Sequence, residues 1–237
     1  MSNHTAVFCR KELRSFFDSH IAYIVITIFL LICGWFFFSD LFLVNQASLR
    51  NLFNIIPFIF MFFVPAITMR LISEEKRSGT IEVLVTLPVR DYEIILGKFL
   101  ASLVLIAVAV LLTSVYVITL SGIADFDLGS VVSGYIGLIF LGAAYLSIGI
   151  FTSSLTQNQI VAFITSFVII FALFMLDKVL MFMPTILASF LEYLSVSYHF
   201  SNISRGVIDS RDVIYYLSLI FFFLFLAVRA LENRKWR

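Results

Sequence analysis

The sequence contains few charged residues. Asp, Glu, Lys and Arg make up only 13% of its 237 residues, about half the share in an average soluble domain. Hydrophobic residues make up 61% of the chain, and the mean hydropathy is +1.05. This composition excludes an ordinary soluble domain and predicts an integral membrane protein. The net charge of +1 gives no attraction for a polyanion, so we expect no nucleic-acid partner.

Groups that perform chemistry are also scarce. The two cysteines form no disulfide framework. The histidines, His4, His20 and His199, lie outside the apolar runs, and we expect all three to be exposed or interfacial. An intramembrane serine protease is excluded because no His lies inside a predicted span. "LGKF" at 96–99 has a Gly-Lys pair but lacks the glycines and the hydroxyl of a phosphate loop. We therefore expect no catalytic residue, no metal and no cofactor in this chain.

Long apolar runs dominate the rest of the sequence. Each is long enough to cross a bilayer, which takes about 20 residues. We expect no cleavable signal peptide, because the first run follows polar and amphipathic residues and lacks a small-x-small cleavage site. An even number of spans places both termini on one side. The six predicted spans lie near 21–38, 52–70, 97–120, 131–153, 159–176 and 213–230.

The distribution of basic residues predicts the orientation of the chain. Lys and Arg gather in cytoplasmic loops of membrane proteins. We therefore expect the termini and the "SEEKRSGT" loop in the cytoplasm, and the acidic "ADFD" loop outside. Twelve basic residues share the side of the termini: Arg10, Lys11, Arg14, Arg70, Lys76, Arg77, Arg90, Lys98, Arg229, Arg234, Lys235 and Arg237. Four lie on the other side: Arg50, Lys178, Arg205 and Arg211.

The first twenty residues form an amphipathic pattern at helical spacing. Such a helix lies along a membrane surface rather than across it, and a frayed basic tail is the alternative interpretation. The apolar face has Ala6, Cys9, Leu13, Phe16 and Phe17, and the polar face has Arg10, Lys11, Arg14 and Asp18.

The predicted span at 131–153 is rich in small residues. Small side chains let helices approach closely in lipid, so we expect a tightly packed interior helix. Its partner could lie in the same chain or in a second copy. The small residues are Ser133, Gly134, Gly137, Gly142, Ala143, Ala144, Ser147 and Gly149.

The connection between the last two spans, residues 177–212, is unusually apolar for a loop. It contains "VLMFMPTILASFLEYL", which Pro184 interrupts and Glu192 marks with a charge. We interpret it as one or two short re-entrant helices at the outer face, where protein must cover irregular backbone. An ordinary external loop is the alternative.

Residues 73–98 form a dense charged segment with an apolar strip, "TIEVLVTL", at 80–87. Ser78, Gly79 and Thr80 are suited to a helix start, with Glu82 in the first turn, and Pro88 discourages helix beyond the strip. The pattern predicts a cytoplasmic helix of about two turns. Such a helix could dock into the groove of a soluble partner or rest on lipid. It would expose Ile81, Leu84, Val85 and Leu87.

No Asp, Glu, Lys or Arg lies near the centre of a predicted span. Proton-coupled carriers need ionisable groups there, so this chain is not expected to pump by itself. Sodium coupling through backbone and hydroxyl oxygens stays open. The hydroxyl groups of the spans fit a lipid, a polysaccharide or a small hydrophobic molecule equally well.

The stretch "EEKRSGTIEVLVTLPVRDYEIILGKFLA", residues 74–101, resembles the signature region of type-2 ABC exporter permeases. "RKELRSFFDSHIAYIV" is similar to the family's N-terminal elbow and first span, and "HFSNISRGVIDSRDVIYYLS" to the outer segment before its last span. The whole set looks closest to the permease subunit of gliding-motility-associated ABC transporters. One departure is Arg90, where the family often has a capping Ser, so the cap would come from Asp91 or be weaker.

The resemblance implies an all-α polytopic protein of the bacterial inner membrane that works in pairs, with a second copy or a related permease. ATP and Mg would be bound by a dimer of cytoplasmic ABC ATPase subunits, and a membrane protein with a large external domain is a further expected partner besides membrane lipid. The coupling segment would comprise Glu74, Glu75, Lys76, Arg77, Ser78, Gly79, Thr80, Ile81, Glu82, Leu84, Leu87 and Pro88. The elbow would add Arg10, Lys11 and Arg14, and the outer gate would use Pro184, Glu192, His199, Arg205 and Gly206.

Two other functions fit the sequence. One is a structural or force-transmitting scaffold that uses the transporter fold without moving a substrate. The other is an ATP-independent channel or carrier. The first would show no ATPase-dependent transport in vesicles, and the second would be active without an ATPase.

Overall fold

The computed structural model describes residues 4–43, 49–80, 89–122, 127–179, 191–207 and 209–233. Every regular element in these ranges is helical. Helices are expected for such an apolar chain, because a helix satisfies its own backbone hydrogen bonds and lipid offers none.

Six helical segments are long and apolar enough to cross a membrane, which confirms the six predicted spans. The third span is interrupted at Thr113, where one helix ends and the next begins. The spans are α2 (His20–Leu43), α3 (Arg50–Thr68), α6 with α7 (Asp91–Leu112 and Ser114–Ser121), α8 (Leu128–Leu155), α9 (Gln159–Val179) and α12 (Ser210–Glu232).

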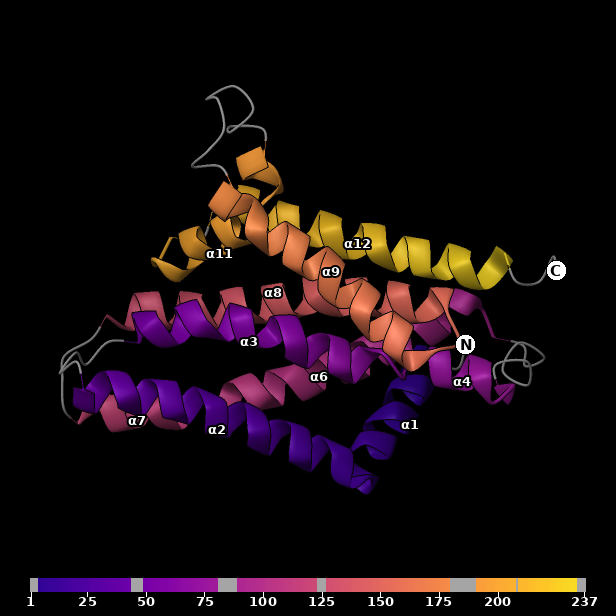
Figure 1. The fold of residues 1–237 in the computed structure, drawn as a ribbon, viewed down its shortest axis with the longest axis horizontal. Coiled ribbons are helices and arrows are strands. Elements are labelled where there is room, and N and C mark those ends of the chain that lie inside the picture. The colour runs from indigo at the N-terminus through magenta and orange to yellow at the C-terminus, as the bar shows by residue number, and fades with distance from the viewer. Residues whose placement is uncertain are drawn as a thin grey trace.

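Shorter helices lie at the two ends of the bundle (Figure 1). At one end α4 (Ser73–Arg77) contacts α8 and α9, and α1 (His4–Asp18) packs on α6 and α2. At the opposite end α11 (Val196–Ser204) packs on α8, α9, α12 and α3. The charged segment that begins with α4 is therefore separated from α11 by the length of the spans.

Helix α8 is the centre of the bundle, as its small residues predict. It contacts α3, α6, α9, α11 and α12. A Cβ atom added to Gly149 would lie 2.0 Å from Oγ1 of Thr68, and one added to Gly134 would lie 2.6 Å from the ring of Phe53. Glycine is needed at both positions because α3 crosses so closely. The partners of these glycines lie in the same chain.

Helix α1 is amphipathic, but its buried face differs slightly from the prediction. Phe8 and Phe16 are buried, whereas Ala6 is exposed. The pattern missed Phe8 because its partners, Ile94 and Val89, lie far away in the sequence. Helix α1 therefore packs on protein along part of its apolar face.

Candidate functional site

Helix α6 begins in the last third of the charged segment at 73–98. Its first residue is Asp91, and Arg90 is the N-cap. The carboxylate of Glu93 accepts a hydrogen bond of 2.9 Å from the backbone N–H of Arg90. This contact is half of a capping box, so the helix start survives the absence of a capping Ser. The sequence left the cap either to Asp91 or to a weaker arrangement, and the contact that the structure shows at this helix start comes from Glu93.

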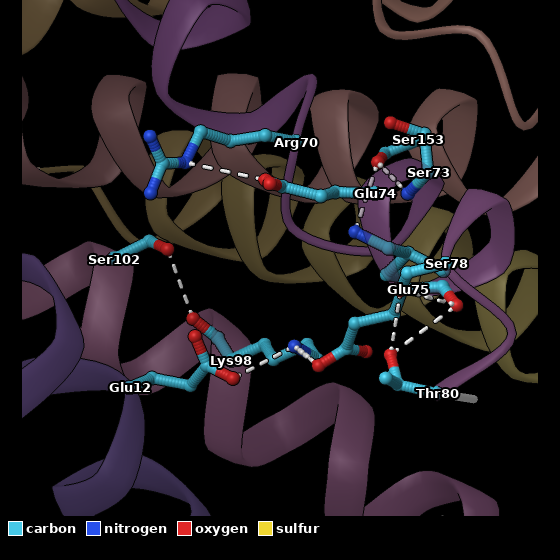
Figure 2. A network of polar contacts seen from close by, with 11 residues as sticks. Glu12, Arg70, Ser73, Glu74, Glu75, Ser78, Thr80, Lys98, Ser102 and Ser153 are labelled. Carbon is cyan, nitrogen blue, oxygen red and sulfur yellow. Dashed lines mark hydrogen bonds and ion pairs between the residues drawn. The ribbon is translucent and has the colours of Figure 1, made fainter.

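Lys98 lies about two turns after this start and joins three elements. Its Nζ atom lies 2.8 Å from Oε1 of Glu12 on α1 and 2.8 Å from Oε1 of Glu75 on α4 (Figure 2). The Lys98 side chain is only 2% exposed, and those of Glu12 and Glu75 are 12% and 19% exposed. We call these three residues the Lys98 cluster.

The electrostatics of the Lys98 cluster make the three elements depend on one another. One ammonium group faces two carboxylates, so the cluster has a net negative charge when all three groups are ionised. Oε2 of Glu75 is buried without a hydrogen-bond partner. Removing one partner of a buried ion pair costs about 3–5 kcal/mol, because the remaining charge stays buried and uncompensated. The cluster thus fixes the positions of α1 and α4 on α6.

Gly97 provides the close approach that the Lys98 cluster needs. A Cβ atom at this position would lie 2.5 Å from Cβ of Phe8 and 3.2 Å from the backbone nitrogen of Cys9. The Gly-Lys pair therefore has two physical roles. The glycine lets α1 cross α6 closely, and the lysine then binds α1 through Glu12.

Helix α4 is also bound to the end of α8. Oγ of Ser153 accepts hydrogen bonds from the backbone N–H groups of Ile72 (3.2 Å) and Ser73 (3.1 Å), and it donates one to the carbonyl oxygen of Met69 (3.1 Å). Figure 2 shows Ser153 beside Ser73. Nζ of Lys76 donates to the carbonyl oxygen of Ser154. The turn between α3 and α4 is therefore attached to the central helix of the bundle.

The predicted elbow residues lie on the open face of α1. Arg10, Lys11 and Arg14 are all exposed. Arg14 forms an ion pair with Asp18 at 3.3 Å, and both side chains are largely in solvent. Exposed pairs of this kind contribute little to stability. The three basic groups are consequently available to a partner surface.

The predicted coupling segment is described only in its first part. Glu74 to Arg77 belong to α4, and Glu74 approaches Arg70 at 3.9 Å. Helix α4 gives way to a turn at Gly79, whose φ of +73° favours glycine. Oγ of Ser78 lies 2.9 Å from Oγ1 of Thr80. Ile81, Glu82, Leu84, Leu87 and Pro88 lie outside the described residues, so the two-turn helix at 80–87 stays a prediction.

At the opposite end of the bundle, around α11, the structure differs from the prediction for His199. His199 was predicted to be exposed or interfacial, but it is 3% exposed and contacts Asp212 of α12. The prediction was wrong because the packing of α11 against α12 and α8, which buries this residue, leaves no signal in local sequence. Arg205 is exposed at the end of α11, Gly206 has φ of +99°, and Glu192 is half-buried. Pro184 lies outside the described residues.

The described residues contain no group of three or more His, Cys, Asp or Glu side chains that could hold a metal ion. Burial raises the pKa of the Cys9 thiol on α1, which disfavours a reactive thiolate.

Sequence reasoning missed Glu12, Ser153 and Asp212 and placed Lys98 simply among the loop charges. A signal for Lys98 was present: it follows a glycine at the start of an apolar run, where a charge must be paired or lie at the interface. Ser153 gave no comparable signal, since serines are common among the small residues of α8.

Comparison with known proteins identifies the family. No curated protein sequence matches the chain. A family model described as "ABC-2 family transporter protein" matches residues 39–230, which include four of the six spans in full and nearly all of the last. Six apolar helices and this match together indicate a multi-pass membrane protein. The chain therefore belongs to the ABC-2 family of transporter proteins, whose members are in general the non-catalytic permease subunits of ABC transporters.

Proposed function

We propose that this chain is the membrane-spanning permease subunit of an ATP-driven exporter, and that α1, α4 and the start of α6 form the surface on which a separate cytoplasmic ATPase acts. The Lys98 cluster is the observation that supports this proposal. One buried ammonium group links the exposed basic helix α1 to the helix that precedes the predicted coupling segment.

A push on this surface would reach the centre of the bundle by short steps. Movement of α4 would be shared with α1 through Glu75, Lys98 and Glu12. The same movement would reach α8 through Ser153, which binds the α3–α4 turn. Because packed interfaces transmit displacement instead of absorbing it, α8 would pass the motion to the helices around it.

The charge distribution supports a cytoplasmic position for this surface. Arg10, Lys11, Arg14, Arg70 and Arg77 all belong to this end of the bundle. In this proposal both termini lie in the cytoplasm, as the positive-inside rule favours, and the membrane is the bacterial inner membrane that the resemblance implies. A partner that presents acidic groups would complement the exposed face of α1.

The other partners in this proposal follow from the exposed faces and the resemblance. Helices α2, α9 and α12 expose many large apolar side chains, among them Trp35, Val168 and Phe221. These faces would contact lipid and a second copy, or a related permease, across the translocation path. The ATPase dimer would bind ATP and Mg. A role in gliding motility, with a partner that has a large external domain, belongs to the same proposal.

A co-purification experiment tests this function. The tagged chain is isolated from native membranes as wild type and with Arg10→Glu, Lys11→Glu and Arg14→Glu combined. Wild type should retain a protein with a Gly-x-x-x-x-Gly-Lys-Ser/Thr phosphate loop. The reversed charges should lower the retained amount about tenfold, which corresponds to ~1.4 kcal/mol of binding free energy.

The matched control reverses three exposed basic residues near the opposite end, with Lys178→Glu, Arg205→Glu and Arg211→Glu. It should retain the ATPase like wild type. Equal loss in both variants would contradict a docking role for α1. A wild-type chain that never co-purifies with such an ATPase would contradict the function itself and favour a carrier or a scaffold.

A further inference from the structure

The end of the bundle away from α4 contains a buried pair of ionisable residues. Nδ1 of His199 on α11 lies 2.6 Å from Oδ1 of Asp212 in the first turn of α12. Both side chains are only 4% exposed. Nε2 of His199 lies 3.1 Å from the backbone carbonyl oxygen of Tyr193. The imidazole thus bridges the start of α12 and the segment that leads into α11.

These partners determine where the protons lie. A carbonyl oxygen can only accept a hydrogen bond, so Nε2 of His199 must hold a proton. Nδ1 would then have a bare lone pair in a neutral ring, and a carboxylate offers only lone pairs as well. A contact of 2.6 Å between Nδ1 and Oδ1 therefore requires one further proton between them.

We propose that His199 and Asp212 form a proton-binding site and that the shared proton holds α11 against α12. The pair is stable either as imidazolium with carboxylate or as neutral imidazole with carboxylic acid. When the proton leaves, two lone pairs face each other in a buried place and the contact opens. This site and its proton are independent of any ATPase.

The surroundings favour a bound proton. The ring of Tyr215 stacks on the imidazole with centroids 4.0 Å apart, and an aromatic face attracts a positive ring. Oδ2 of Asp212 is buried without a hydrogen-bond partner, so a carboxylate there has little stabilisation besides His199. Loss of the proton would remove the attraction between the ring of Tyr215 and a positive imidazole, and it would leave the Asp212 carboxylate with less stabilisation.

The other titratable groups near the pair are mostly tyrosines. Tyr215 and Tyr216 come from α12, and Tyr145 from α8 interacts electrostatically with both of them. On the α9 side, Asp177 and Lys178 form an ion pair at 3.2 Å and line a pocket with Ser197 and Ser201 of α11. The charges of that ion pair balance each other, so the ion pair adds no net charge on the α9 side of α11.

Two hydroxyl groups of α12 would partly hold the same segment after the proton leaves. The hydroxyl of Tyr215 donates to the carbonyl oxygen of Leu194 at 2.7 Å, and that of Tyr216 donates to the carbonyl oxygen of Val196 at 3.0 Å. Loss of the proton should therefore loosen α11 and its N-terminal approach without detaching the whole helix.

Nitrogen NMR of the full-length chain in detergent tests the proton assignment. The chain has only His4, His20 and His199, so His4→Gln with His20→Gln leaves one labelled imidazole. Its Nε2 signal should be that of a protonated nitrogen at every pH. Its Nδ1 signal should change as the pH is raised across the range in which the chain stays folded. An Nε2 without a proton, or an Nδ1 signal that stays constant across that range, would overturn the proposal.

Hydrogen exchange of residues 193–204, corrected for intrinsic rates, tests the effect on α11. Wild type should lose protection about tenfold or more once the shared proton has left. Asp212→Asn is the informative variant, because its amide NH₂ can donate to the bare Nδ1 and keep the contact without a titrating proton.

Protection of α11 in Asp212→Asn should therefore be independent of pH, while protection in Asp212→Ala should be lowered at every pH. The proposal would be overturned if wild type and Asp212→Asn lost the same amount of protection as the pH rises. It would also be overturned if protection of α11 in wild type did not change when the shared proton leaves. Asp212→Asn remains decisive if Asp212→Ala fails to fold.

Discussion

At the scale of single residues, the most consequential side chain of the charged end is Lys98. It is 2% exposed, and it is the common partner of two glutamates on different helices. A buried cation that two elements share stabilises their relative position more than a pair of surface charges would. The Lys98 cluster thus fixes α1 and α4 to α6, and its removal should loosen both helices.

We expect Lys98→Met to lower the free energy of unfolding by about 3–5 kcal/mol, because two carboxylates would stay buried without a cation. The triple variant Glu12→Leu, Glu75→Leu and Lys98→Met should recover most of that loss, since no buried charge remains. Thermal unfolding of the detergent-solubilised chain measures both. A triple variant less stable than Lys98→Met alone would contradict the electrostatic interpretation.

The residues of the Lys98 cluster show the limit of sequence reasoning. Glu12 and Lys98 are 86 positions apart, and Glu75 and Lys98 are 23 apart. Helical spacing predicts neighbours within about four residues, so it gives no information on such pairs. His199 was mistaken for an exposed residue for the same reason, because its burial depends on a contact with α12. The sequence shows which residue types are present here, but it does not show which residues they contact.

At the scale of elements, α8 decides how the bundle packs. Its glycines let α3 and α6 approach, and its Ser153 binds the turn before α4. Position 149 is the tightest of these contacts. The neighbouring Thr68 donates to the carbonyl oxygen of Val64 at 2.9 Å, so its hydroxyl is held in place and cannot easily yield.

We expect Gly149→Ala to destabilise the chain by about 1–3 kcal/mol, through overpacking against Thr68. Gly122→Ala is the matched control, because among the described residues a Cβ atom there would have only the carbonyl oxygen of Thr119 nearby, at 3.8 Å. Its melting temperature in detergent should stay close to that of wild type. Equal melting temperatures for the two variants would show that α3 can move away from α8 without cost.

The elements themselves were largely predictable. A hydrocarbon core about 30 Å thick requires about 20 apolar residues, so each span leaves a long run in the sequence. Small residues at 131–153 likewise predicted a packed interior helix, because close approach is what such residues permit. The packing of α1 on α6 was less accessible, since Phe8 finds its partners only in the folded chain. The helix at 80–87 stays a prediction.

At the scale of the whole molecule, charge is concentrated at one end of a mainly apolar bundle. Helices α1 and α4 and the start of α6 gather there, whereas the opposite end holds the buried His199–Asp212 pair (Figure 1). In the proposed function, the energy comes from a separate ATPase, and the charged end is the surface on which that ATPase would act.

Photo-cross-linking in living cells tests this account most directly. A photo-reactive amino acid is placed at Lys11 on α1, at Ser78 after α4, or at Arg205 after α11, all of which are exposed. We predict that Lys11 and Ser78 cross-link to a cytoplasmic protein that has an ATP-binding phosphate loop, and that Arg205 does not. Cross-links to such an ATPase from Arg205 alone, or from none of the three positions, would contradict the account.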